Sequence, residues 1–147
     1  MNWKVYLAGE IHSNWREELM QSDLPIDWYS PNTNHEDSDD CGALILGSEE
    51  DKFWYDRKGA GVNGIRTRTL LAKSDVVIVK FGEKYRQWNA AFDAGMAVAM
   101  GKQLIVIHPP EFQHALKELD SEAAAVCETT EQALKVLAYI TQGTLER

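Results

Sequence analysis

The chain has 147 residues and a mass of 16.6 kDa, so we expect residues 1–147 to form one domain. Its 15 Lys and Arg residues against 23 Asp and Glu residues give a net charge of −8, which argues against binding to nucleic acid polymers or anionic membranes. A hydrophobic fraction of 44% excludes wholesale disorder, and no apolar run approaches the ~20 residues that span a bilayer. Cys41 and Cys127 stand far apart, which favours a reducing cytoplasm over a disulfide framework or a cysteine-built metal site.

Short apolar runs alternate with helical patterns from the start of the chain. Residues 5–8 are typical of a buried strand, and residues 13–20 then follow helical spacing, with Ser13 as the expected N-cap. Residues 26–29 form a second short strand that ends at a Ser-Pro-Asn sequence. Residues 32–63 combine acidic, aromatic and glycine-rich stretches and are expected to be irregular.

The second half of the chain repeats the alternation more clearly. Its most distinct strand is continuously apolar and β-branched, as in a strand covered on both faces. An alanine-rich helix follows and ends at Gly101, a favourable residue just past a helix. The expected elements are a helix over 64–73, a strand over 75–79, a helix over 89–100, a strand over 103–107, a helix over 111–119, a weak strand over 123–127 and a final helix from Thr130.

Strands separated by single helices predict an α/β fold with a parallel sheet covered on both faces. Five strands suit a three-layer, flavodoxin-like (Rossmann-like) sheet in the order 2-1-3-4-5. Ligands of such sheets bind beyond the carboxyl ends of the strands, near the point where the strand order reverses. The segments expected at that edge are residues 9–12, 30–32, 81–83 and 108–110.

Asp93 is the leading candidate for chemistry. It lies in the first turns of the alanine-rich helix and should therefore lie at the ligand-binding edge of the sheet. A carboxylate there can attack an anomeric carbon or stabilise an oxocarbenium-like transition state. The alternative is structural, because the helix dipole favours an acid in a first turn by ~0.3–1 kcal/mol.

Glu10 directly follows the first strand, in a turn opened by Gly9, and glycine permits close approach of a ligand to the backbone. Glu10 is either an acid/base partner of Asp93, a ligand of ribose hydroxyls or a solvated turn carboxylate. His12 lies beside the same expected cleft and is a candidate donor to a substrate.

Residues 59–64 read GxGxxG, but no strand precedes them, so a flexible loop is favoured over a dinucleotide site. Arg66 and Arg68 belong to the locally basic stretch around this sequence, which suits either a single phosphate group or a solvated helix face. The aromatic residues 53–55 are expected to pack on the body, with stacking on a base as the alternative. The acidic residues 35–40 do not match a calcium-binding loop and are expected to be solvated.

Three motifs resemble the nucleoside 2-deoxyribosyltransferase superfamily, and the resemblance covers most of the chain. They are Val5-Tyr6-Leu7-Ala8-Gly9, Ser74-Asp75-Val76-Val77-Ile78-Val79, and Phe92-Asp93-Ala94-Gly95-Met96-Ala97 with Gly101-Lys102-Gln103. Residues 6–12 and 63–68 are similar to the uncharacterised YtoQ-type branch of that superfamily.

The resemblance implies action on the N-glycosidic bond of nucleosides or their 5′-monophosphates. Asp93 matches the nucleophile, with Asp in place of the usual Glu, and Tyr6 matches an assisting group on the first strand. The chain departs from the family pattern where Glu10 replaces a proline, Arg66 replaces an acid, and Gln87-Trp88-Asn89 replaces the usual polar residues. The resemblance further implies a homodimer or larger homo-oligomer in which a neighbouring subunit completes the site.

The sequence therefore predicts an N-glycosidic-bond hydrolase or transferase without metal or organic cofactor. The expected catalytic residues are Asp93, Glu10 and Tyr6, and the expected substrate-binding residues are Gly9, His12, Arg66, Arg68, Phe81 and Asn89. The alternative is a nucleotide-binding or sensor module that kept the pocket and lost the chemistry.

Overall fold

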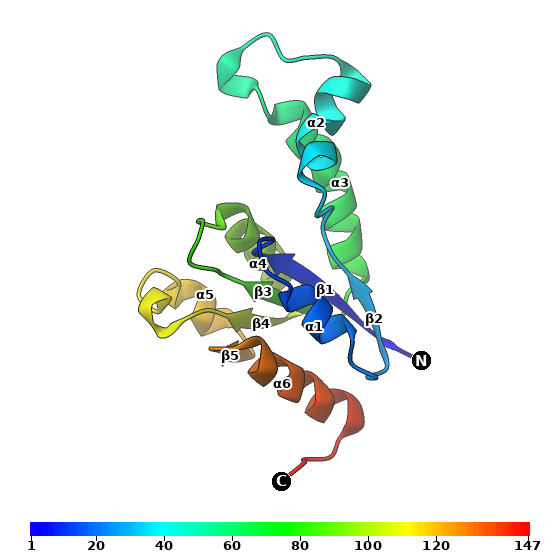
Figure 1. Cartoon of the computed structure of the whole chain (residues 1–147), viewed down its shortest axis with the longest axis vertical. Coiled ribbons are helices and arrows are strands. Elements are labelled where there is room, and N and C mark those ends of the chain that lie inside the picture. The colour runs from blue at the N-terminus through cyan, green and yellow to red at the C-terminus, as the bar shows by residue number, and fades with distance from the viewer.

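A computed structural model describes all residues, 1–147 (Figure 1). Its centre is a five-stranded parallel sheet in the order β2-β1-β3-β4-β5. The strands are β1 (Trp3–Gly9), β2 (Ile26–Tyr29), β3 (Val76–Lys80), β4 (Gln103–Ile107) and β5 (Ala125–Cys127). The predicted fold class and strand order are confirmed.

Helices cover both faces of this sheet. They are α1 (Trp15–Met20), α4 (Trp88–Ala99), α5 (Lys117–Glu122) and α6 (Thr130–Gln142), with a short 3₁₀ turn, η2 (Pro110–Phe112). The helix expected over 111–119 is thus divided between η2 and α5. The expected N-cap at Ser13 is wrong, because Asn14 occupies that position and Ser13 instead hydrogen-bonds to Glu10.

The core consists of two apolar layers, one on each face of the sheet. Alternate residues of β1 divide between them, since successive side chains of a strand point to opposite faces. Val5 and Leu7 pack with α1 and α6, whereas Tyr6 and Ala8 pack on the face covered by α4. The side chain of Tyr6 therefore lies in the same layer as the inner face of the alanine-rich helix.

The expectation that residues 32–63 are irregular is wrong. They contain α2 (His35–Leu46), the 3₁₀ turn η1 (Lys52–Trp54) and the beginning of α3 (Arg57–Lys73). We call residues 35–73 the arm, because α2 and α3 form an antiparallel pair that projects away from the sheet (Figure 1). Near its end, α3 returns to the body and buries Leu71 in the core.

The GxGxxG sequence lies inside α3 and is not the flexible loop that was expected. Its first glycine has a packing role: Gly59 faces Gly42 of α2, and a methyl group added at Gly42 would lie 2.2 Å from the backbone nitrogen of Gly59. The aromatic residues 53–55 are exposed at the outer end of the arm, so the expectation that they pack on the body is also wrong. No helix is long and apolar enough to cross a membrane.

Candidate functional site

A cavity of about 630 Å³ opens beyond the carboxyl end of β1, where the strand order reverses. Three segments build its wall: the loop between β1 and α1, the base of the arm, and the loop that leads into α4. The lining residues are Gly9, Glu10, Ile11, His12, Pro31, His35, Tyr85, Arg86, Gln87, Trp88, Asn89, Ala90 and Asp93. The cavity thus lies at the edge at which ligands of doubly wound sheets bind.

Asp93 enters the cavity from the second turn of α4. Ala90, Ala94 and Ala97 form the face of α4 that is buried against the sheet, and Asp93 lies beside that face, half-buried. Burial raises the pKa of the Asp93 carboxyl from 3.8 to about 6, because desolvation disfavours the charged form. Asp93 is consequently a poorly solvated carboxylate at neutral pH, a state that suits a nucleophile or a charge stabiliser.

Tyr6 lies close to Asp93, wholly buried in the layer beneath α4. Burial raises the pKa of the Tyr6 hydroxyl to about 12, and the Asp93 charge adds to this, whereas Thr67, Arg66 and Arg16 partly offset it. The hydroxyl therefore stays protonated and can donate a hydrogen bond. The hydroxyl is fully buried, and no partner meets the geometric limits of an ordinary hydrogen bond, although the Thr67 side chain lies close enough to lower its pKa.

Glu10 lines the same cavity, but its side chain is buried and held by its own loop. One carboxylate oxygen accepts from the backbone amide of His12, and the other accepts from the Ser13 hydroxyl at 2.5 Å. Gly82 makes room for this side chain, because a methyl group added there would lie 2.5 Å from the Glu10 Cγ. The cavity therefore contains both predicted acids, with the oxygens of Glu10 already hydrogen-bonded.

Arg16 fixes the backbone of the loop that carries Glu10. Its buried guanidinium donates to the carbonyl oxygens of Leu7, Gly9 and Glu10 at 3.2, 3.2 and 2.8 Å. The indole of Trp15 donates to the same Glu10 carbonyl at 2.6 Å. Sequence reasoning missed this role, and the available signal was an arginine between the apolar residues of a short helix.

The backbone conformation at position 9 requires glycine. Its φ is +110°, and a methyl group added there would lie 2.1 Å from the Lys80 carbonyl oxygen of the neighbouring strand. No side chain fits this position, so the turn from β1 into the cavity requires glycine.

His12 joins three segments at the mouth of the cavity. Its ring centroid lies 4.7 Å from that of Tyr85 and 5.8 Å from that of His35. Tyr85 comes from the loop before α4 and His35 from the first residue of α2. Sequence reasoning missed Tyr85 and His35, because the first lies in a loop without periodicity and the second in a segment expected to be irregular.

The other expected binding residues divide in two. Asn89 lines the cavity and is exposed. Arg66 donates instead to the carbonyl oxygen of Ser30 at 2.7 Å, and the Arg68 guanidinium lies against Gly64 within the arm. Phe81 is buried and lines two neighbouring cavities.

The chain matches the family model described as nucleoside 2-deoxyribosyltransferase YtoQ over residues 6–141. It is 47% identical to the uncharacterized protein YtoQ of Bacillus subtilis (strain 168) over 144 residues, which cover 95% of this chain and 97% of that protein.

Two solved structures resemble the fold. A conserved protein from Enterococcus faecalis V583 superposes with a TM-score of 0.63 and 19% identity, covering 95% of this chain and 99% of that chain. A 2-deoxyribosyltransferase from Bacillus psychrosaccharolyticus superposes with a TM-score of 0.59 and 16% identity, covering 89% and 90%. At these identities the likeness concerns the fold, whereas the family match and the YtoQ relative span nearly the whole chain: it belongs to the nucleoside 2-deoxyribosyltransferase YtoQ family.

Proposed function

We propose that this protein is an enzyme that cleaves or exchanges the N-glycosidic bond of a nucleoside, a nucleoside 5′-monophosphate or a related ribosyl compound. The observation that carries the proposal is a half-buried carboxylate, Asp93, that lines a cavity at the carboxyl edge of the sheet and has the buried hydroxyl of Tyr6 near it. Membership in a family of nucleoside 2-deoxyribosyltransferases supports the ligand class.

In the proposed reaction, an oxygen of Asp93 attacks C1′ of the sugar. The bond between C1′ and the base nitrogen breaks, its electron pair leaves with the base, and a glycosyl ester of Asp93 remains. Water then attacks C1′, loses a proton and releases the sugar, which regenerates the carboxylate. If a second base attacks instead of water, the same intermediate gives transfer.

The roles of the neighbouring residues follow from their contacts. Tyr6 donates its hydroxyl hydrogen to the Asp93 carboxylate or to the sugar, which orients the attacking oxygen. The departing base takes its proton from solvent, and the Glu10 carboxylate receives the proton that the attacking water loses and returns it to solvent; for this Glu10 exchanges its bond with Ser13 for a bond to that water. Gly9, His12 and Asn89 bind the substrate along the wall of the cavity.

Arg66 and Arg68 do not line the cavity, so we do not assign them a direct contact with the substrate. Arg66 contributes its charge near Tyr6 and ties α3 to the end of β2 through Ser30. Phe81 lines two neighbouring cavities at the carboxyl edge of the sheet and supports the loop between them.

The test is a panel of nucleosides and nucleoside 5′-monophosphates, with and without an acceptor base, followed by chromatographic detection of free or exchanged base. Asp93→Asn should lower turnover by about 10³-fold or more, because the substitution removes the attacking charge. Asp23→Asn is the matched control: Asp23 is exposed and makes no hydrogen bond or ion pair. Turnover that Asp93→Asn leaves unchanged would remove Asp93 from the mechanism.

The second candidate is a nucleotide-binding or sensor module without turnover. The hydrogen bonds that occupy both carboxylate oxygens of Glu10 favour it. Asp is also shorter than the usual Glu by one methylene, and a displacement near 1 Å can lower a rate ~10²-fold. Thermal-shift screening with the same panel separates the two candidates, since a sensor is stabilised by a compound that it never converts.

We propose in addition that the protein acts as a homodimer or larger homo-oligomer, as the resemblance to nucleoside 2-deoxyribosyltransferases implies.

A further inference from the structure

The two helices of the arm contact each other through small and polar residues. A methyl group added at Gly42 would lie 2.2 Å from the backbone nitrogen of Gly59, so the two backbones nearly touch. Beside this contact, the Asn63 amide donates to the Ser38 carbonyl at 2.9 Å. Apart from Leu71 at its base, the arm buries only Gly42 and Gly59, so it lacks an apolar core of its own.

The large apolar side chains of the arm are instead exposed. Leu44 and Ile45 of α2 are 83% and 69% exposed, and Ile65 of α3 is 67% exposed. The other exposed apolar side chains of the arm are Leu46, Phe53, Trp54 and Tyr55. A concentration of this kind on one projecting element is typical of an association surface.

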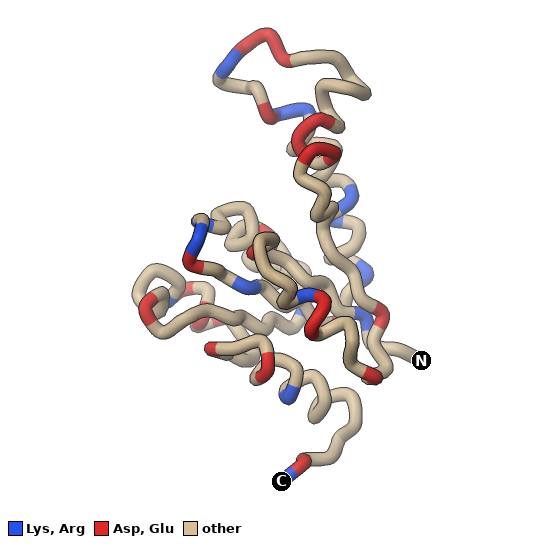
Figure 2. Tube along the Cα trace, viewed as in Figure 1, with Lys and Arg blue, Asp and Glu red and all other residues tan.

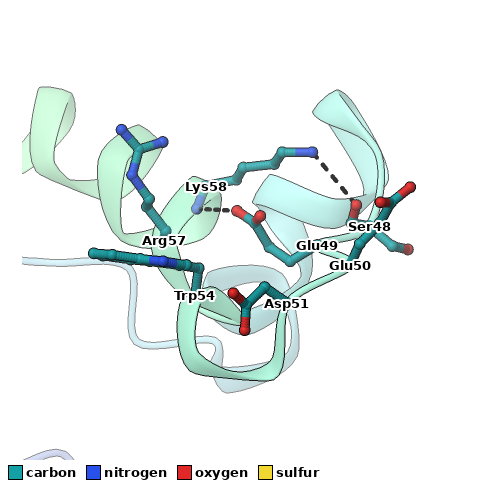
Figure 3. A pocket seen from close by; sticks show the side chains of 7 residues that line it. All are labelled: Ser48, Glu49, Glu50, Asp51, Trp54, Arg57 and Lys58. Atoms are coloured by element: carbon teal, nitrogen blue, oxygen red, sulfur yellow. Dashed lines mark hydrogen bonds between the residues drawn. The ribbon is translucent and has the colours of Figure 1, made fainter.

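Hydrogen bonds from Lys58 connect the turn at the outer end of the arm to α2 and α3 (Figure 3). The Lys58 ammonium donates to the carbonyl oxygen of Gly47 at 3.0 Å, which caps the end of α2. It also donates to the carbonyl oxygen of Ser48 at 3.4 Å. The Lys58 amide donates to a Glu49 carboxylate oxygen at 3.1 Å, which ties the turn to the start of α3. The exposed side chains are therefore presented on a fixed frame, which reduces the entropy lost on association.

The two helices carry opposite charges that make no ion pair with each other. In α2 the four charged residues are Glu36, Asp37, Asp39 and Asp40, and in α3 the five charged residues are Arg57, Lys58, Arg66, Arg68 and Lys73. The ion pairs of the chain, His108–Asp120 and Lys135–Glu131, lie outside the arm. The arm thus has an acidic and a basic helix side by side (Figure 2). Lys58 and Arg66 donate to backbone carbonyl oxygens, whereas the four acidic side chains of α2 and the side chains of Arg57, Arg68 and Lys73 make no hydrogen bond.

We propose that the arm is the interface of a homodimer, in which it packs antiparallel against the arm of a second copy and forms a four-helix layer. In this arrangement the acidic residues at the base of α2 come level with the basic start of α3 in the other arm, and the acidic turn, residues 49–51, comes level with Arg66 and Arg68. Each arm carries both the acidic and the basic groups. A twofold-symmetric contact therefore pairs the acidic groups of each arm with the basic groups of the other. The exposed leucine and isoleucine side chains supply the apolar centre.

The arm is thus the proposed surface for the self-association proposed above. The mass of the protein in solution tests this surface, independently of turnover. Sedimentation velocity and light scattering should give twice the chain mass for the unmodified protein over about 1–100 µM. The double variant Leu44→Glu/Ile45→Glu should raise the dimer dissociation constant about 100-fold or more, because four carboxylates then face one another at the centre.

Two further variants complete the experiment. Ile65→Glu should weaken the dimer from the other helix, whereas Leu145→Glu, at a 62% exposed leucine outside the arm, should leave the mass unchanged. Circular dichroism checks that each variant is folded. We expect all of them to fold, because the substituted side chains are exposed in the single chain. A monomeric unmodified protein, a dimer that both arm variants leave intact, or loss of folding in both arm variants would overturn the proposal. Base release, measured separately, tests the proposed activity and does not depend on this result.

Discussion

At the scale of single residues, the proposed activity rests on the proximity of Asp93 and Tyr6. The two side chains come from different elements, since Tyr6 lies on β1 and Asp93 on α4, and the sheet brings them into one apolar layer. That layer desolvates the carboxyl and the phenol alike, which raises both pKa values. The result is a carboxylate that titrates just below neutrality beside a phenol that keeps its proton.

This environment predicts the pH dependence of the proposed reaction. Only the ionised carboxylate can attack C1′, so kcat/KM should rise about tenfold per pH unit below pH 6 and become level above it. Tyr6, with a pKa of about 12, stays protonated over the whole range and contributes no second limb near neutrality. Initial rates of base release between pH 4 and pH 9 measure the profile. A plateau that persists to pH 4 would show that the titration of Asp93 does not limit the rate.

Sequence reasoning could reach some of these residues and not others. Gly9 ends β1, Glu10 directly follows it, and Asp93 lies in the first two turns of α4; all three are at the predicted edge and line the cavity. Nothing in the sequence shows that the Glu10 carboxylate binds its own loop, since this depends on the turn that Arg16 holds. The proximity of His12 to Tyr85 is equally a property of the folded loops.

At the scale of elements, the sheet and the arm differ in how far the sequence specifies them. The residues of β3 and β4 are continuous apolar runs, which identify buried parallel strands directly. In the arm, α2 begins with acidic residues and α3 contains three glycines, Gly59, Gly61 and Gly64, a composition that favours loops. These helices pack closely through their backbones at Gly42 and Gly59. Neither helix propensity nor hydrophobic periodicity could predict that contact.

The contact between Gly42 and Gly59 gives a direct test of this account. Gly42→Ala should destabilise the arm by about 1–3 kcal/mol, because the added methyl group meets backbone atoms that cannot move aside. Gly61→Ala in α3 is the matched control: nothing lies within 4 Å of the added group, so the change should stabilise the helix by about 0.5–1 kcal/mol. Amide hydrogen exchange along α2 and α3 measures both. Equal protection in the two variants would contradict the close contact as the determinant of the arm.

At the scale of the whole molecule, the cavity and the arm share one edge of the sheet. The chain leaves the end of β2, passes Pro31 and His35 in the cavity wall and continues into the arm (Figure 1). The body supplies Tyr6 and Asp93, while the first residue of α2 supplies a ring that lies beside His12. The base of the arm is therefore part of the candidate site, and its outer end is the proposed interface.

The burial of Asp93 also has a consequence for the stability of the whole fold. Its folded-state pKa of about 6 exceeds its ordinary value of 3.8, so the native state binds this proton more tightly than the unfolded state does. The contribution of Asp93 to the free energy of unfolding therefore falls as the pH rises from 3.8 to about 6, and above this range the carboxylate destabilises the fold. Converted directly, this shift corresponds to about 3 kcal/mol, and solvent screening of the partly exposed side chain reduces it to about 1–2 kcal/mol.

Asp93→Asn should accordingly stabilise the protein by about 1–2 kcal/mol at pH 7.5 while it lowers turnover, and the gain should vanish near pH 4, where the native carboxyl is protonated. Urea unfolding followed by circular dichroism at both pH values measures the difference. Asp23→Asn removes an exposed charge of the same kind and should change stability by less than about 0.5 kcal/mol at either pH. If Asp93→Asn were no more stable than the unmodified protein at pH 7.5, the carboxylate would be solvated in the native state, and its description as a desolvated nucleophile would be wrong.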